Sequence, residues 1–175
     1  RIKSKIKTVS YNGDVATNEE VYSYNTQQLL SRVEKRADAT TNYVTEDNTY
    51  DLFGNITSKK ITAGSNSRTV SWGYDTSGRF LTSKIDIESL PTTFTYYPNG
   101  TLKTETNPYG QTSTYEYDSW FRKSKMTDYL QKTVTYGYEI DSRNNRSVLT
   151  AVSSDGTATS DGYDELGRKI NEGVK

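Results

Sequence analysis

The sequence predicts an all-β protein, built as an antiparallel meander of consecutive β-hairpins. Three observations lead to this fold class. Tyrosine supplies 15 of the 175 residues while hydrophobic residues make up only 31%, below the roughly 45–50% of ordinary globular domains. Turn signals recur about every ten to twelve residues, and a longer motif recurs about every 22 residues. Aromatic and hydroxyl-bearing side chains suit half-buried strands, and turns at this spacing leave strands of about six to eight residues.

Residues 1–19 are expected to form a leading strand and hairpin. Basic and apolar residues alternate at the start, which places Lys3, Lys5 and Lys7 on one face of the predicted strand. Asn12-Gly13 is a two-residue hairpin signal. Lysines at alternate positions are typical of a solvated strand face or a protected sheet edge; the alternative is a site for an anionic partner. Because the chain starts inside this strand pattern, we expect it to be a fragment of a longer protein.

Residues 20–175 contain about seven copies of one motif, each beginning with a tyrosine. In the fullest copies aspartate follows the tyrosine and glycine comes three residues later, as in Tyr50-Asp51-Leu52-Phe53-Gly54. Aspartate at the first position of a turn accepts hydrogen bonds from backbone amides further on. Glycine with positive φ forms the bulge that restores the strand twist, so each copy predicts a strand, a tight turn and a strand. The repeated tyrosines are Tyr24, Tyr50, Tyr74, Tyr96, Tyr117, Tyr138 and Tyr163.

The copies differ in how completely they keep the motif. The copy at Tyr117 has Asp118 but carries Phe121 at the glycine position, and the copies at Tyr24 and Tyr138 are weaker, with the same turn expected in each. We predict positive φ at the glycines Gly54, Gly78, Gly100 and Gly167. Further turns are expected about half a period away, at residues 63–66, 88–91, 107–110, 128–131 and 154–156.

Composition excludes several kinds of chemistry. The chain has no histidine and no cysteine, which removes Ser-His-Asp and Cys-His catalysis and imidazole or thiolate metal sites. The formal net charge is zero, so no electrostatic footprint for nucleic acid or an anionic membrane is present. No apolar run reaches the roughly 18 residues of a membrane span. We therefore expect no catalytic residues, no cofactor, no metal, no nucleic-acid partner and no membrane span.

The repeated aspartates and aromatics each have a structural and a functional interpretation. Asp51, Asp75, Asp118 and Asp164 recur once per hairpin, which favours turn formation over a converging catalytic pair. The tyrosines favour a ladder that packs between neighbouring strands over sugar binding. Three aromatics are kept as possible ligand contacts, and two of them, at turn positions, are expected to pack over the sheet or else to form an exposed contact. They are Trp72 and the turn residues Trp120 and Phe121.

The segments Tyr74-Asp75-Thr76-Ser77-Gly78-Arg79-Phe80 and Tyr163-Asp164-Glu165-Leu166-Gly167-Arg168 resemble the signature of the YD, or Rhs, repeat family. The resemblance covers roughly residues 20–170. It implies a long spiral β-sheet of hairpins that winds into a hollow shell. Relatives in this family include bacterial polymorphic toxins, insecticidal toxin complexes, wall-associated proteins and teneurins, and in the toxins the shell encloses a C-terminal toxin domain.

The resemblance and the composition together predict a structural, non-enzymatic arc of such a shell in a large secreted or surface protein of a bacterium. Its partners would be neighbouring repeats of the same longer chain or a partner protein at the open sheet edges, and an enclosed toxin domain or a glycan. The alternative is a module of a cell-surface adhesin, which binds glycan or protein through the exposed face of the sheet.

Overall fold

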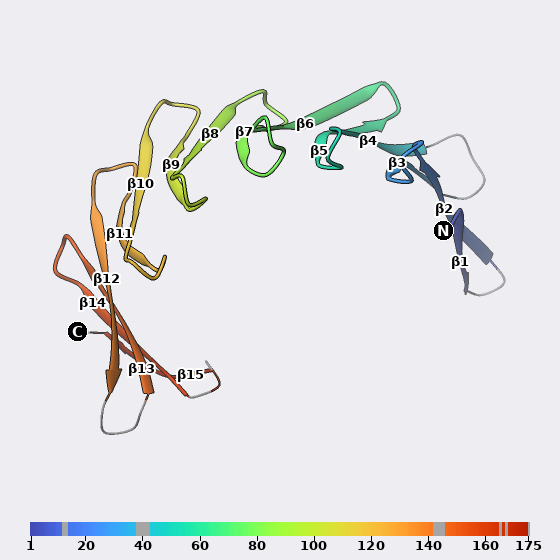
Figure 1. The fold of residues 1–175 in the computed structure, drawn as a ribbon. Coiled ribbons are helices and arrows are strands. Elements are labelled where there is room, and N and C mark those ends of the chain that lie inside the picture. The colour runs from blue at the N-terminus through green and yellow to red at the C-terminus, as the bar shows by residue number, and fades with distance from the viewer. Residues whose placement is uncertain (12–13, 38–42, 142–145, 165, 167, 175) are drawn as a thin grey trace. The chain divides into compact units, whose positions relative to one another are not determined.

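The computed structural model describes residues 1–11, 14–37, 43–141, 146–164, 166 and 168–174. These residues form fifteen β-strands and contain no helix (Figure 1). Each strand runs antiparallel to the next one along the chain, and the strand order in the sheet follows the sequence order. The predicted all-β meander of consecutive hairpins is therefore confirmed.

The chain divides into two compact units, Arg1–Thr92 and Thr93–Lys175, called unit 1 and unit 2 below. Unit 1 pairs its seven strands in order, with the long strand β2 near one end. Its strands are β1 (Ser4–Tyr11), β2 (Asp14–Tyr24), β3 (Leu30–Ala37), β4 (Tyr43–Tyr50), β5 (Ile56–Ala63), β6 (Asn66–Tyr74) and β7 (Leu81–Ile85).

Unit 2 begins within β8 and continues the same pattern of pairing from each strand to the next. Its strands are β8 (Pro91–Tyr96), β9 (Leu102–Thr106), β10 (Thr112–Tyr117), β11 (Lys123–Thr127), β12 (Thr133–Asp141), β13 (Arg146–Ser153), β14 (Ala158–Tyr163) and β15 (Lys169–Val174). The predicted division at residues 19 and 20 stays a prediction.

A register shift accompanies six of the seven repeated tyrosines. The shift falls between the tyrosine and the residue before it. At this point the following strand carries one extra residue that has no partner in the ladder. Such a bulge bends the strand and increases its local twist. The six tyrosines are Tyr24, Tyr50, Tyr74, Tyr96, Tyr117 and Tyr163.

The seventh tyrosine departs from the prediction. No turn follows Tyr138, because β12 continues to Asp141 and Tyr138 lies opposite Leu149 in the ladder. The expected turn at residues 138–142 is therefore wrong. This copy has neither aspartate after the tyrosine nor glycine at the bulge position, so nothing local stops the strand there.

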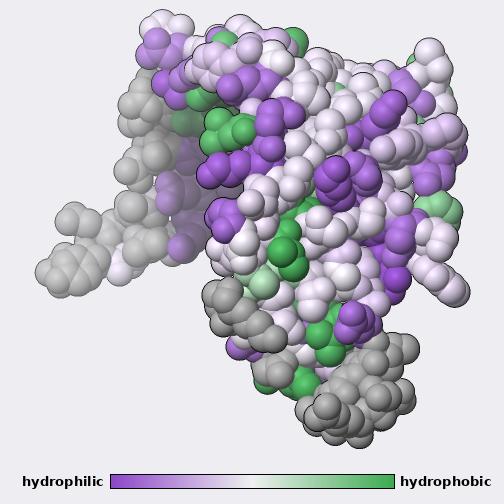
Figure 2. Space-filling view, turned by 90° about the vertical axis from the view of Figure 1, so that its left-hand side faces the viewer, coloured by the Kyte–Doolittle hydropathy of each residue, from purple (hydrophilic) through white to green (hydrophobic). Residues whose placement is uncertain are grey.

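Little of the molecule is buried. Among the residues whose burial the structure describes, only Val33, Ser113, Tyr115 and Gly162 are buried. A sheet that forms a single layer leaves both faces open to solvent, whereas an ordinary domain packs two or more layers around a core. On the face that Figure 2 presents, hydrophobic side chains form small separate patches among hydrophilic ones. Stability must therefore come largely from contacts between neighbouring hairpins.

Each unit has one face that carries the repeated aromatics, named here the tyrosine face. Side chains of paired residues lie on the same face of a sheet, and successive residues alternate between faces. In unit 1 this face includes Glu20, Lys35 and Val44, which are opposite one another on β2, β3 and β4. In unit 2 it includes Tyr115 and its partner Met126.

Candidate functional site

The repeated turns are built around the aspartate. In the Asp75 turn the Gly78 amide donates to the Asp75 carbonyl at 2.9 Å, which closes the turn. The Asp75 carboxylate oxygen Oδ1 accepts from the Arg79 amide at 2.8 Å and from the Phe80 amide at 2.9 Å. Asp51 does the same for the amides of its own turn. The aspartates thus satisfy backbone donors that the turn removes from the ladder.

The arginine of the motif has two placements. Arg122 Nε donates to Asp118 Oδ2 at 2.8 Å, and Arg168 Nε donates to Asp164 Oδ2 at 2.7 Å. These arginines therefore bind the aspartate that begins their own turn. Arg79 instead lies over the Phe80 ring, with 5.2 Å from Cζ to the ring centroid.

The predicted positive φ is confirmed at three glycines, with φ of 88° at Gly54, 67° at Gly78 and 89° at Gly100; Gly167 lies outside the described residues. Phe121 occupies the glycine position of its turn with φ of 60°. Three further residues without glycine's freedom take the same conformation, namely Gln28, Ser89 and Gln131. A residue other than glycine is strained by about 1–2 kcal/mol in this left-handed conformation. The hydrogen bonds of each turn outweigh that strain.

The turns between the copies use the same device. Asp128 Oδ1 accepts from the Leu130 and Lys132 amides, and Asn107 Oδ1 accepts from the Tyr109 and Gln111 amides. One expected turn is misplaced: the turn predicted at 88–91 starts at Asp86, whose carboxylate accepts from the Glu88 and Leu90 amides. The signal that could have located it is the aspartate itself, eleven residues after Asp75.

Successive repeated turns of unit 1 touch one another. The Phe53 ring lies against the Cα of Gly78, so close that a Cβ added there would be 2.2 Å from the ring. Asn55 Nδ2 donates to the Gly78 carbonyl at 2.7 Å. Leu29 makes a looser contact of the same kind, 3.6 Å from the position of a Cβ on Gly54. Glycine is therefore needed at Gly78 for the space as well as for φ.

The hydroxyls of three repeated tyrosines, Tyr24, Tyr50 and Tyr138, bind the backbone of a preceding segment. Tyr50 donates to the Leu30 carbonyl at 2.7 Å, and Tyr138 donates to the Lys123 carbonyl at 2.9 Å. Both acceptors stand six residues after the previous repeated tyrosine. Tyr24 donates to the Ile2 carbonyl at 2.9 Å. At Tyr50 and Tyr138 this six-residue spacing places the tyrosine hydroxyl beside the first residue of the second strand of the preceding hairpin.

The remaining repeated tyrosines are half-buried at the ends of their strands: Tyr74, Tyr96, Tyr117 and Tyr163. Burial raises the pKa of Tyr96 and of Tyr117. Tyr117 meets the Tyr97 ring edge-on, with 6.2 Å between centroids and 87° between planes. This geometry is a favourable one for aromatic pairs.

Three aspartates of the repeated turns, Asp51, Asp75 and Asp118, have a lowered pKa. The Ser77 hydroxyl, followed by the Phe80 amide, lowers the pKa of Asp75 to about 2. Desolvation raises the pKa of Asp51, but hydrogen bonds from Asn55 and other amides outweigh it and the net pKa is lowered. Desolvation opposes the Arg122 contact at Asp118 in the same way, and its net pKa is also lowered. These groups stay ionised and act as hydrogen-bond acceptors, which does not suit them to proton transfer near neutral pH.

The aromatics kept as possible contacts differ in exposure. Trp72 is half-buried on β6 opposite Lys84. Trp120 is 77% exposed and Phe121 is 62% exposed. Of the two alternatives expected for this pair, packing over the sheet or an exposed position, these exposures agree with the exposed position.

Two further searches cover only the described part of the chain. No group of three or more Asp, Glu, His or Cys residues there could hold a metal ion. No helix there is long and apolar enough to cross a membrane.

The fold has known counterparts, although no family model and no curated protein matches the sequence. A chain of the crystal structure of TcdB2-TccC3-Cdc42 is similar over 97% of this chain, with a TM-score of 0.56 and 14% identity. A chain of the Photorhabdus luminescens Tc holotoxin pore, carrying a mutation in TccC3, is similar over 97% of this chain, with a TM-score of 0.55 and 14% identity.

The likeness is one of fold, since the identity is 14% in both cases. The chain spans 11% of the length of each of these toxin chains. It is a repeat protein made of hairpins whose turns are held by side-chain hydrogen bonds. Its fold is similar to that of a segment of the Tc toxin chains.

Proposed function

We propose that the chain is a structural, non-enzymatic segment of a YD/Rhs-repeat β-shell in a large secreted or surface protein of a bacterium, which encloses or presents a toxin or effector. The observation that carries the proposal is the likeness to Tc toxin chains over 97% of the chain. The contacts of the repeats agree with it. Tyrosine hydroxyls bind neighbouring hairpins and the turn aspartates bind their own amides, so the recurring polar groups serve the wall itself.

The test is electron microscopy of the natural full-length product. A hollow closed particle is the expected result, and a solid or rod-like particle would contradict the shell. Protease treatment of intact and opened particles then tests enclosure. An internal segment protected only in the intact particle supports it, and equal cleavage in both states contradicts it. Recovery of the product only from the cytosol would contradict secretion or surface display.

A second function, an adhesin module that binds glycan, is favoured by one observation. Trp120 and Phe121 form an exposed aromatic pair at 77% and 62% exposure, and aromatic faces bind sugars and proteins alike. Binding to a glycan array that Trp120→Ala abolishes, with an unchanged melting temperature, would support this function over the shell. Tyr109→Ala is the matched control, because Tyr109 is an exposed aromatic of a turn between copies.

A further inference from the structure

The tyrosine face of unit 1 is basic. Its strands carry six cations against three carboxylates, and ladder pairing places all of them on this face. On the opposite face of the same strands, three cations balance three carboxylates. The cations of the tyrosine face are Lys5, Lys7, Lys35, Lys59, Arg68 and Lys84, and the carboxylates at its ladder positions are Asp14, Glu20 and Glu46.

Part of this charge is compensated on the face itself. Glu46 accepts from Lys35 at 2.7 Å and from Lys59 at 3.1 Å, which lowers the pKa of Glu46. This group of three side chains keeps a net positive charge. Neither Lys5 nor Lys7 makes an ion pair within the part of the chain that the structure describes, and both are exposed.

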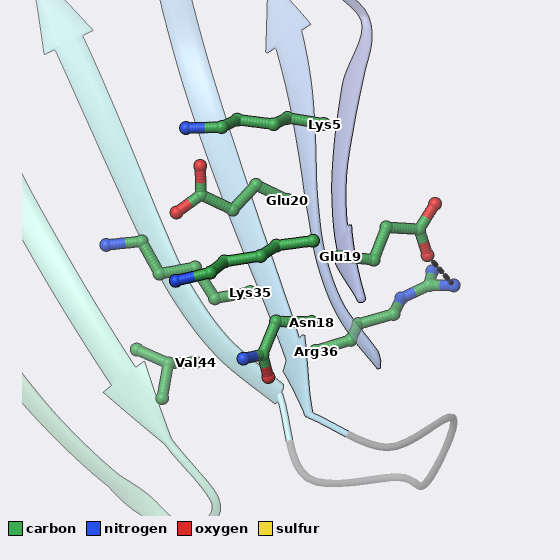
Figure 3. Close-up of a pocket in the computed structure, with 8 residues that line it drawn as sticks. Lys5, Asn18, Glu19, Glu20, Lys35, Arg36 and Val44 are labelled. Atoms are coloured by element: carbon green, nitrogen blue, oxygen red, sulfur yellow. Dashed lines mark hydrogen bonds and ion pairs between the residues drawn. The ribbon is translucent and has the colours of Figure 1, made fainter. Parts of the chain in front are cut away.

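Two hollows lie on this face. One, of about 400 Å³, is lined by Lys5, Lys7, Asn18, Glu20, Lys35 and Val44, whose labelled side chains point to the same side in Figure 3. Glu19 and Arg36, which also border it, point to the other side and pair with each other at 3.5 Å.

The second hollow, of about 340 Å³, is lined by both aliphatic and basic side chains. Ile61, Val70 and Ile87 line it together with Lys59 and Arg68. Ile61 and Ile87 are 43% and 48% exposed, which leaves apolar surface uncovered beside ammonium and guanidinium groups. Val44 of the first hollow pairs with Ala63 of the second, so the hollows are neighbours on the sheet.

We infer that the tyrosine face of unit 1 binds an acidic polypeptide segment with interspersed aliphatic residues. The lysines and Arg68 attract its carboxylates, and the two hollows accept its aliphatic side chains. The inference goes beyond the proposed function, because it requires no shell and no toxin.

The tyrosine face is less suited to a nucleic acid or an acidic glycan. Base stacking needs free aromatic faces beside the cations, but the Arg1 guanidinium already lies over the Tyr24 ring, 5.2 Å from its centroid. A nucleic acid or acidic glycan that carries an anion on every nucleotide or sugar would also be repelled by Glu20 and Glu46. A polypeptide can place its carboxylates away from these two side chains.

Fluorescence anisotropy of the full 175-residue chain tests the inference. The probe is a fluorescein-labelled peptide of alternating glutamate and leucine, at about 50 mM and about 300 mM salt. The tyrosine-face variant is Lys5→Gln/Lys7→Gln, and its matched control is Arg32→Gln/Lys60→Gln on the opposite face. We expect the first variant to weaken binding about fivefold or more, with the control within about twofold of the original chain, on the scale of screened surface charges.

Several results would overturn the inference: no binding by the folded chain, equal losses in both double variants, or tighter binding of a thymidine oligonucleotide or heparin. An all-glutamate peptide that binds as well as the glutamate–leucine peptide would remove the role of the hollows. Circular dichroism checks that each variant is folded. If Lys5→Gln/Lys7→Gln fails to fold, Arg68→Gln, in the lining of the second hollow, takes its place.

Discussion

The two units build the same hairpins but use their cations differently. In unit 2 two cations beside the repeated tyrosines lie on aromatic rings: Arg122, which also binds Asp118, lies over Tyr138 at 4.2 Å, and Lys123 lies near Tyr115 at 5.0 Å and Tyr136 at 5.8 Å. The corresponding contacts of unit 1 are made by its arginines, Arg1 over Tyr24 and Arg79 over Phe80. In unit 1 the lysines of the tyrosine face reach carboxylates or solvent instead. The repeat therefore fixes the turns and the tyrosines, while the chemistry of the face between them is free to vary.

The units also differ in what little they bury. Unit 2 buries Tyr115 and Ser113, whereas the buried residue of unit 1 among those described is the smaller Val33. Tyr115 in addition donates to Glu105 at 3.3 Å, and burial raises its pKa. A larger buried side chain should make unit 2 the more sensitive of the two to truncation at its centre.

The largest expected effect is the loss of Tyr115. Tyr115→Ala should lower the free energy of unfolding by about 3 kcal/mol, as aromatic truncations in packed sites do. Val33→Ala in unit 1 should cost about 2 kcal/mol, because fewer methyl groups leave the packing. Urea denaturation measures both. Tyr109→Ala is the control: Tyr109 is 82% exposed, so its loss should stay within about 0.5 kcal/mol. A Tyr109 variant as unstable as the Tyr115 variant would contradict this account of the packing.

Two glycines with similar backbone conformation separate the effect of φ from the effect of space. Gly110 of unit 2 has φ of 77° and nothing within 4 Å of an added Cβ, whereas Gly78 has φ of 67° and the Phe53 ring against it. Gly110→Ala should cost about 1 kcal/mol from the left-handed conformation alone. Gly78→Ala should cost about 2 kcal/mol, because the ring must also move away.

A double-mutant cycle sharpens this contrast. Phe53→Ala removes the ring, so adding Gly78→Ala to it should cost only the amount measured for Gly110→Ala. Denaturation of the four proteins gives the coupling. Additive effects of Phe53→Ala and Gly78→Ala would show that the two turns do not depend on each other.

Much of this fold could be predicted from the residues, because the determinants are local. Tyrosine, aspartate and glycine at fixed spacing define the turn, and alternation defines the faces. The bulges and the glycine φ values followed from the turn chemistry. The copy at Tyr138 failed where those residues are missing, and there the ladder with β13 determines the structure.

The rest depends on contacts between hairpins. The Phe53–Gly78 contact joins residues that are 25 positions apart in two successive turns, and no local pattern indicates it. Left-handed Gln28, Ser89 and Gln131 carry no glycine signal. The basic face could not be predicted either, because each bulge shifts the register by one residue and so changes which lysines share a face. The alternation of Lys5 and Lys7 alone predicts a solvated strand face or a protected edge, and only strand pairing puts Lys35 and Lys59 on the same face.

The smallest expected effect concerns pH and is shared by both units. The Ser77 hydroxyl at Asp75 and the Ser153 hydroxyl at Asp155 are the main causes that lower each pKa to about 2. Since the folded-state pKa lies below the ordinary value of about 3.9, each carboxylate stabilises the fold above about pH 4 and loses this contribution as the pH falls toward 2. Asparagine keeps the acceptor for the amides, as Asn107 does in its own turn, but it does not titrate. Asp75→Asn and Asp155→Asn should each lower the melting temperature slightly at pH 6. Their difference from the original chain should vanish near pH 2, whereas a difference that persists there would show that the charge of these turns contributes nothing.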